Sequence, residues 1–205
     1  MEAYLVRHGE VEIDAGFLRG NPPLSDAGRA QARALGARLR EIDFDVCLVS
    51  PLLRAQETAR LLLEGRAIPT ETHACLAEGA FGALDGLARG AELERHPEFY
   101  RLGRTVLPRL AAAGSTAPGG ETREQFLARA KVARALVEKP VFDPSARALV
   151  VSHGGLLAYL IQLLLGHEPR DDVTIGFEFC GVARVTAYRE EPSFGPFAML
   201  RFVSS

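Results

Sequence analysis

Cysteine is scarce in this sequence, and the pattern that would give it a chemical role is missing. The 205 residues include three cysteines, Cys47, Cys75 and Cys180, which are odd in number and widely spaced. Zinc sites and redox dithiols usually show cysteines paired in a CxxC motif, and no such pair occurs. We therefore expect three buried free thiols in a reducing compartment, with no disulfide or zinc chemistry.

Lysine is also rare, and the sequence has no basic block. Lys131 and Lys139 are the only lysines, and the formal net charge is -2. A protein that binds nucleic acid usually carries net positive charge or a basic cluster, so the composition predicts no nucleic-acid partner. The other cations are arginines, whose planar guanidinium groups suit bidentate contacts with phosphate or carboxylate.

No apolar run in the sequence is long enough to cross a membrane. The longest one, at 154–166, is too short to span a bilayer and contains Gln162. The residues after Met1 form no basic leader and run directly into an apolar segment. We therefore expect a cytoplasmic protein without a membrane partner.

Two common catalytic signatures are absent as well. The sequence contains no GxSxG motif, which argues against a serine nucleophile elbow. It also contains no Walker A loop, so nucleotide phosphates are not bound in the usual way.

Three short apolar runs are present, and they predict strands. Residues 3–6, 46–49 and 148–151 are continuously apolar rather than alternating, which is typical of strands buried on both faces of a parallel sheet. Two further strands are expected late in the chain, at 182–188 and 197–203.

Helical patterns follow these runs. Ser25 is a candidate N-cap, and Thr122 with Gln125 forms a candidate capping box. We predict helices from Ser25 to about Glu41, from about Leu53 to Glu64, from Thr122 to Lys139 and from Leu156 to Leu165. Strand–helix alternation of this kind predicts an α/β fold, a three-layer sandwich with a mostly parallel central sheet and helices on both faces.

We expect one domain over 1–205, with a small inserted helical cap at about 86–121. This segment is rich in arginine, alanine and glycine and has weak periodicity. Its arginines either meet an anionic substrate or form a solvated helix face, and the sequence leaves both possibilities open.

Polar residues follow each of the three early strands. Arg7 and His8 come after the first, Arg54 comes shortly after the second, and His153 comes after the third. Ligands of open parallel sheets bind beyond the carboxyl ends of the strands, so these side chains are expected to share one edge. Two arginines and two histidines suit a dianionic phosphate and would repel a metal cation, so we expect no metal and no cofactor.

Several segments together resemble the histidine phosphatase superfamily, which includes the cofactor-dependent phosphoglycerate mutases. The similarity covers nearly the whole chain. The segments that carry it are LVRHGE at 5–10, LSDAG at 24–28, SPLLRAQETA at 50–59, LAE at 76–78 with FGALDG at 81–86, PGGET at 118–122 and VSHGG at 151–155.

The resemblance implies a role for each matching residue. His8 would attack phosphorus and hold the phosphoryl group, and Glu78 would donate a proton to the leaving oxygen. Arg7, Arg54 and His153 would bind the phosphoryl oxygens. Asn21 and Gly154 are further candidates for binding the phosphate. Glu10 either orients a catalytic side chain or faces solvent, while Ser50 and Ser152 either donate supporting hydrogen bonds or simply end strands.

The mutases of this family are longer, with an adjacent arginine pair that holds the substrate carboxylate. No Arg-Arg pair occurs here, which favours a phosphomonoesterase acting on a small phosphorylated metabolite. Mutase-type phosphoryl transfer and a non-catalytic phosphate-binding protein are the alternatives. Phosphoglycerate, sugar phosphates, nucleoside monophosphates and α-ribazole phosphate all remain open as substrates. A homodimer is possible, with a strand at 67–73 as one candidate edge.

Overall fold

The computed structural model describes residues 2–12, 21–80, 119–138, 146–170, 175–191 and 195–203. The predicted cap at 86–121 lies almost wholly outside these residues, as does Lys139, the expected end of the third helix.

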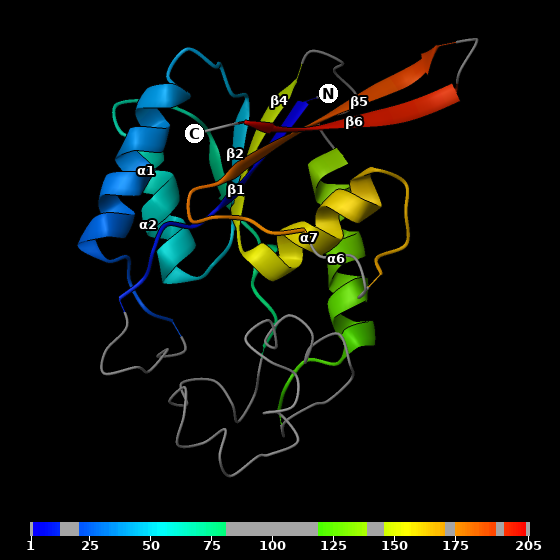
Figure 1. Ribbon diagram of the computed structural model, residues 1–205, viewed down its shortest axis with the longest axis horizontal. Coiled ribbons are helices and arrows are strands. Elements are labelled where there is room, and N and C mark those ends of the chain that lie inside the picture. The colour runs from blue at the N-terminus through cyan, green and yellow to red at the C-terminus, as the bar shows by residue number, and fades with distance from the viewer. Residues whose placement is uncertain are drawn as a thin grey trace.

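A six-stranded sheet forms the centre of the described structure, in the order β3-β2-β4-β1-β5-β6 (Figure 1). The four strands β3, β2, β4 and β1 are parallel, whereas β5 runs antiparallel to β1 and β6 antiparallel to β5. The sheet is therefore mostly parallel, as predicted, and the strand expected at 67–73 lies at its edge as β3. The strands are β1 (Glu2–Arg7), β2 (Val46–Val49), β3 (Thr70–Thr72), β4 (Arg147–Ser152), β5 (Val182–Glu191) and β6 (Gly195–Val203).

Helices cover both faces of this sheet. Figure 1 shows α1 and α2 on one side and α6 and α7 on the other. Side chains of β1 alternate accordingly, since Tyr4 and Val6 pack in the core with α1 and α2, while Ala3 and Leu5 pack in the core with α6 and α7. Burial on both faces explains the continuous apolar runs and confirms the predicted α/β sandwich. The helices are α1 (Asp26–Arg38), α2 (Leu53–Leu62), α6 (Arg123–Glu138) and α7 (Gly154–Leu164), with a short 3-10 helix η1 (Ala74–Leu76).

The predicted helix starts are confirmed for α1 and α6. The Ser25 hydroxyl accepts a hydrogen bond from the Gly28 N–H at 3.0 Å and caps α1. Thr122 and Gln125 form the predicted capping box. The Thr122 hydroxyl accepts from the Gln125 N–H at 3.2 Å, and the Gln125 side-chain oxygen accepts from the Thr122 N–H at 2.8 Å.

Other predicted helix ends were wrong by a turn or less. α1 ends at Arg38 rather than near Glu41, and α2 ends at Leu62 rather than Glu64. The chain there tightens into turns with bonds between residues three apart, such as Ile42 N–H to the Leu39 carbonyl, which satisfy carbonyls that the helix leaves open. α7 begins at Gly154 instead of Leu156, so its first turn contains two glycines.

Helix α7 is apolar because it is buried between the sheet and α6. Eight of its 11 residues are buried, including Gln162, whose amide donates to the Ala158 carbonyl and accepts from the Arg170 N–H. Within the described residues, no helix combines the length and the hydropathy needed to cross a bilayer.

Candidate active site

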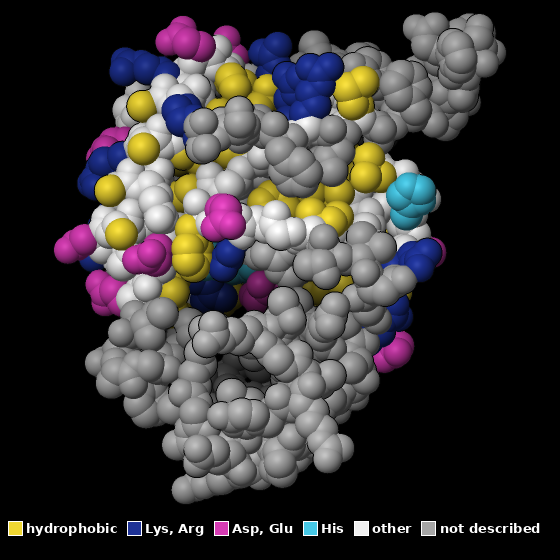
Figure 2. Space-filling view, viewed as in Figure 1, with side chains coloured by type: hydrophobic (Ala, Val, Ile, Leu, Met, Phe, Trp, Pro, Cys, Tyr) yellow, Lys and Arg dark blue, Asp and Glu magenta, His cyan; other side chains and the backbone are white. Residues whose placement is uncertain are grey.

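Strands β1, β2 and β4 bring polar residues to one edge of the sheet at their carboxyl ends. Arg7 ends β1, and the N–H of His8 donates to the Ser152 carbonyl at the end of β4, at 3.0 Å. The ring centroids of His8 and His153 lie 5.0 Å apart. Arg54 reaches the same place from the first turn of α2, where its Nε lies 3.3 Å from His153 Nδ1. In the view of Figure 2, basic, histidine and acidic side chains adjoin at a hollow near the middle of the molecule.

His8 is held as a neutral imidazole with one defined tautomer. Its Nδ1 lies 2.7 Å from the Gly9 carbonyl oxygen, which can only accept, so Nδ1 carries the proton and Nε2 keeps its lone pair. The Gly9 N–H donates to the Thr58 hydroxyl at 3.0 Å, which fixes this turn against α2. Burial lowers the pKa of His8 to about 3, with the charges of Arg54 and Arg7 acting in the same direction. At neutral pH His8 therefore offers an unprotonated nitrogen, which nucleophilic attack requires.

His153 is fully buried, and both of its ring nitrogens are engaged. Arg54 Nε donates to Nδ1, so Nε2 carries the proton and donates to the Ser50 hydroxyl at 2.7 Å. Burial lowers the pKa of His153 well below its ordinary range, and the charge of Arg54 adds to this. In this arrangement His153 orients Arg54. A direct bond from His153 to a phosphoryl oxygen stays a prediction, because one of these two contacts would have to be exchanged for it.

The Arg7 guanidinium is packed between protein groups. Its Nη1 donates to the Phe177 carbonyl at 2.5 Å, and its Cζ lies 4.1 Å from the centroid of the Phe179 ring. Burial lowers the pKa of Arg7, while the Glu78 and Glu178 carboxylates oppose the shift. Among the described residues, its buried Nε has no hydrogen-bond partner. Leaving a buried donor unpaired costs free energy, and an anionic oxygen would remove that cost.

Glu78 lies shortly after η1, with its carboxylate at the start of α7. Oε2 accepts from the Gly155 N–H at 3.2 Å, and Oε1 accepts from the Gly79 N–H at 3.1 Å. The first turn of a helix offers unpaired N–H groups and the positive end of its dipole, both of which suit a carboxylate. A Cβ at Gly155 would lie only 2.6 Å from Oε1, so the carboxylate fits here because residue 155 is glycine. The electrostatic effect of Glu78 on Arg7 associates it with the same site.

Asn21 and Gly154 both lie beside these residues. The Asn21 side-chain oxygen accepts from the Leu53 N–H at 2.7 Å and thereby caps α2, which leaves the amide NH₂ as the part that can donate to a phosphate. A Cβ at Gly154 would lie 3.7 Å from Arg7 Nε, so the Gly154 backbone adjoins the unpartnered donor. Their contacts with phosphate stay predictions.

The supporting polar residues have specific partners. Glu10 is half-buried, and its carboxylate accepts from the Ser25 hydroxyl at 2.9 Å and so steadies the N-cap of α1. Ser50 contacts His153, and the Ser152 hydroxyl donates to the Leu76 carbonyl at 2.7 Å. Ser152 thus donates a supporting hydrogen bond, as predicted, whereas Ser50 accepts from His153 and from the Leu52 N–H. The three cysteines are free, as predicted, although Cys75 is only half-buried.

Comparison with known proteins decides the family. A profile of the histidine phosphatase superfamily (branch 1) matches residues 3–196. The chain belongs to this superfamily. An adenosylcobalamin/alpha-ribazole phosphatase of Salmonella typhimurium is 35% identical over 168 residues, 80% of each chain. A 2,3-bisphosphoglycerate-dependent phosphoglycerate mutase of Methylobacterium sp. is 34% identical over 174 residues, 79% of each chain. The crystal structure of the alpha-ribazole phosphatase from Shigella flexneri has a TM-score of 0.80 at 27% identity, covering 100% of this chain and 96% of that one.

Enzymes of the histidine phosphatase superfamily share a phosphohistidine mechanism. The two relatives, one a phosphatase and one a mutase, are nearly equally similar to this chain. Membership therefore shows a family in which phosphoryl transfer through a phosphohistidine is general, and it leaves the acceptor of the phosphoryl group open.

Some residues of this histidine phosphatase site were missed by sequence reasoning. Phe177 and Phe179 reach Arg7 because β5 pairs with β1 in antiparallel register, with Val182 opposite Val6. The Cys180 N–H also donates to the Arg7 carbonyl at 3.1 Å. No motif marks this segment, since its position depends on a strand register that the sequence does not reveal.

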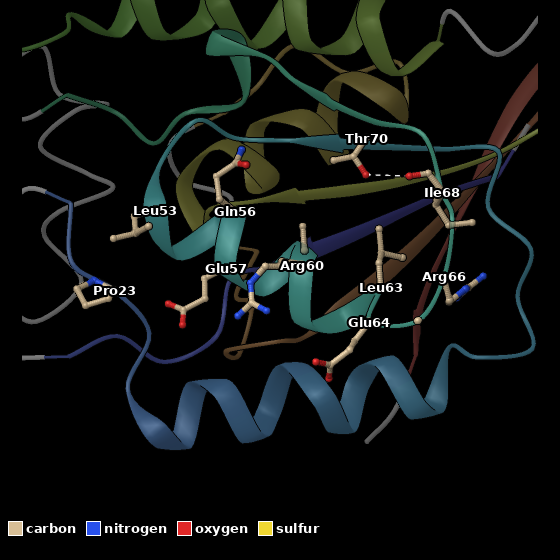
Figure 3. A pocket seen from close by; sticks show the side chains of 12 residues that line it. Pro23, Leu53, Gln56, Glu57, Arg60, Leu63, Glu64, Arg66, Ile68 and Thr70 are labelled. Atoms are coloured by element: carbon tan, nitrogen blue, oxygen red, sulfur yellow. Dashed lines mark hydrogen bonds between the residues drawn. The ribbon is translucent and has the colours of Figure 1, made fainter.

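A second hollow, of about 850 Å³, lies on the outer side of α2 and the chain that follows it (Figure 3). Leu53, Gln56 and Leu63 are among the side chains that line it. None of the predicted catalytic residues does so, and this hollow is therefore separate from the histidine phosphatase site.

The neutral histidines of the site are expected to make stability depend on pH. The pKa of His8 is 6.5 in the unfolded chain and about 3 in the native protein. Between these two pH values His8 is protonated in the unfolded chain and neutral in the native protein. Folding stability should therefore fall as pH drops below 6.5, by about 1.4 kcal/mol per pH unit for each such histidine. In urea unfolding, a His8→Gln variant should lose less stability than wild type between about pH 7 and about pH 5. Parallel pH dependences of the two proteins would show that His8 is not held neutral.

Proposed function

We propose that the protein is a phosphomonoesterase that hydrolyses a small phosphorylated metabolite through a phosphohistidine at His8. The observation that carries this proposal is the neutral His8, with its Nε2 lone pair available, beside a buried guanidinium donor of Arg7 that has no partner in the described part of the chain. A dianionic phosphate supplies both the electrophile for the imidazole and the acceptor for the arginine.

In the first step, the lone pair of His8 Nε2 attacks phosphorus and the ester P–O bond breaks. The leaving oxygen takes a proton from the Glu78 carboxyl. The Gly9 carbonyl, which accepts from Nδ1–H, stabilises the positive charge that develops on the ring. Arg7 and Arg54 offset the negative charge on the phosphoryl oxygens.

In the second step, water attacks the phosphoryl group and gives a proton to the Glu78 carboxylate. The P–N bond breaks, and its electron pair returns to Nε2. Inorganic phosphate leaves, and both His8 and Glu78 regain their starting protonation states.

Mutase-type transfer is the second candidate, because a relative with 34% identity is a phosphoglycerate mutase. The two reactions share the first step and differ in whether water or a bound phosphoglycerate accepts the phosphoryl group. The absence of an Arg-Arg pair supports water as the acceptor.

The proposal is tested by mixing the enzyme with an aryl phosphate and with an alkyl phosphate. We expect turnover of both esters, release of inorganic phosphate, and an acid-labile phosphoenzyme trapped by rapid quenching. No turnover and no phosphoenzyme would refute an enzymatic role. Phosphoryl transfer to 3-phosphoglycerate that outpaces hydrolysis would identify a mutase instead.

A further inference from the structure

Arg129 on α6 uses every N–H donor of its guanidinium group. Nε and Nη2 donate to the two carboxylate oxygens of Glu121 at 2.8 and 2.6 Å. Nη1 donates to the carbonyls of Cys75 and Ala77 at 3.1 and 2.6 Å, and Nη2 also donates to the Glu78 carbonyl at 3.3 Å. A guanidinium has five N–H groups, so all five are engaged. The Arg129 side chain is 19% exposed and that of Glu121 is 14% exposed.

The backbone leading to Glu78 is held by side chains rather than by a strand or helix. Regular structure ends with η1 at Leu76, yet each carbonyl from residue 75 to residue 78 has a side-chain donor. Arg129 supplies three of these donors, and Ser152 supplies the one to the Leu76 carbonyl. Arg129 and Ser152 therefore determine the path of the chain at the point where the acid is attached.

The position of the Glu78 carboxyl is sterically demanding. It lies against the first turn of α7, where a single added carbon at Gly155 would already clash. General acid catalysis requires hydrogen-bond reach to the leaving oxygen, and a misplacement of about 1 Å can cost about 100-fold in rate. A small shift of the 75–78 backbone would therefore move Glu78 out of reach while Arg7, which ends β1, and His8, which follows it, stayed in place.

The contacts of Arg129 point to a role through geometry rather than charge. Its charge is paired with the carboxylate of Glu121, which lies between 2.6 and 2.8 Å from the guanidinium nitrogens, and it adds to the burial that lowers the pKa of His153. Lysine would keep the charge but lacks the planar fork that reaches Glu121 and three carbonyls at once. A lysine substitution therefore separates the two kinds of role.

We propose that Arg129, oriented by Glu121, is a positioning residue that places the Glu78 carboxyl for proton transfer to the leaving oxygen. This inference rests on the proposed role of Glu78 as proton donor. It predicts that Arg129 matters most for substrates whose leaving group needs a proton.

The test compares kcat/KM of an Arg129→Lys variant for an alkyl and an aryl phosphate. We expect about a 10- to 100-fold loss for the alkyl ester and less than about a threefold loss for the aryl ester. The amount of phosphoenzyme that forms in a burst with the aryl ester should be the same as in wild type. This amount measures how many active sites are correctly folded. Equal losses for both esters, or no loss for either, would overturn the proposal.

Two further variants keep the outcome interpretable. Arg134 lies on the same helix and pairs with Glu138 at 2.8 Å. An Arg134→Lys variant should keep the wild-type kcat/KM for both esters. Glu121→Gln keeps its shape but loses the charge that orients Arg129, and it should show a smaller alkyl-selective loss. Thermal melting shows whether Arg129→Lys folds. If it does not, Glu121→Gln decides: an equal loss of kcat/KM for both esters, or no loss for either, overturns the proposal.

Glu78→Gln distinguishes the two levels of failure. If kcat/KM of this variant drops equally for both esters, the proposed role of Glu78 is refuted, and the positioning role of Arg129 is refuted with it. If kcat/KM of Glu78→Gln drops selectively for the alkyl ester while that of Arg129→Lys and Glu121→Gln does not, only the positioning role of Arg129 is refuted.

Discussion

Replacing His8 by alanine is expected to lower kcat/KM by roughly 10⁴- to 10⁶-fold, the scale of loss seen when an enzyme's nucleophile is removed. The reason is that His8 presents a neutral nitrogen with a free lone pair beside Arg7 and Arg54. Phosphoenzyme should become undetectable by rapid quenching with either ester. Binding of inorganic phosphate should persist, because the arginines that attract it remain.

His73→Ala is the matched control for this result. His73 is half-buried and pairs with Glu71 at 3.0 Å just after the edge strand β3. Its loss should leave turnover unchanged. Retention of phosphoenzyme in His8→Ala would place the covalent step on another residue and refute the proposed mechanism.

The second large effect is expected from Glu78→Gln, and it should depend on the leaving group. An alkyl alkoxide is a poor leaving group, so loss of the proton donor should reduce kcat/KM for an alkyl phosphate by about 10²- to 10⁴-fold. An aryl leaving group needs less protonation, and its kcat/KM should fall by much less. Steady-state kinetics with both esters measure the difference.

Glu71→Gln provides the matched control, because Glu71 is an exposed carboxylate on β3. This variant should leave both esters unchanged. A uniform loss in Glu78→Gln would mean that Glu78 acts on phosphate binding or on the fold rather than as the acid.

The sequence reveals those parts of the site that follow directly from a strand. Arg7, His8 and His153 adjoin the ends of buried parallel strands, and the parallel order alone brings such residues to one edge. The same pattern predicts the sheet and the helical layers, because runs buried on both faces need cover on both sides.

The remaining contacts depend on distances that no local pattern specifies. Phe179 reaches Arg7 through the antiparallel register of β5. Arg129 reaches the Glu78 segment across the interface between α6 and η1, and a lone arginine on an amphipathic helix gives no sign of its partners. The tautomer of His153 follows from Arg54 and Ser50, which meet only after folding.

The chain on either side of 81–118 is joined at its base, since the Glu121 N–H donates to the Ala80 carbonyl at 2.8 Å. Glu78 and the Arg129–Glu121 pair both lie within this join or next to it. The two described segments that flank 81–118 are thereby tied to each other two residues beyond Glu78. The Glu78 segment is thus anchored on both sides, by the Arg129 guanidinium at residues 75 to 78 and by the Glu121 N–H at residue 80.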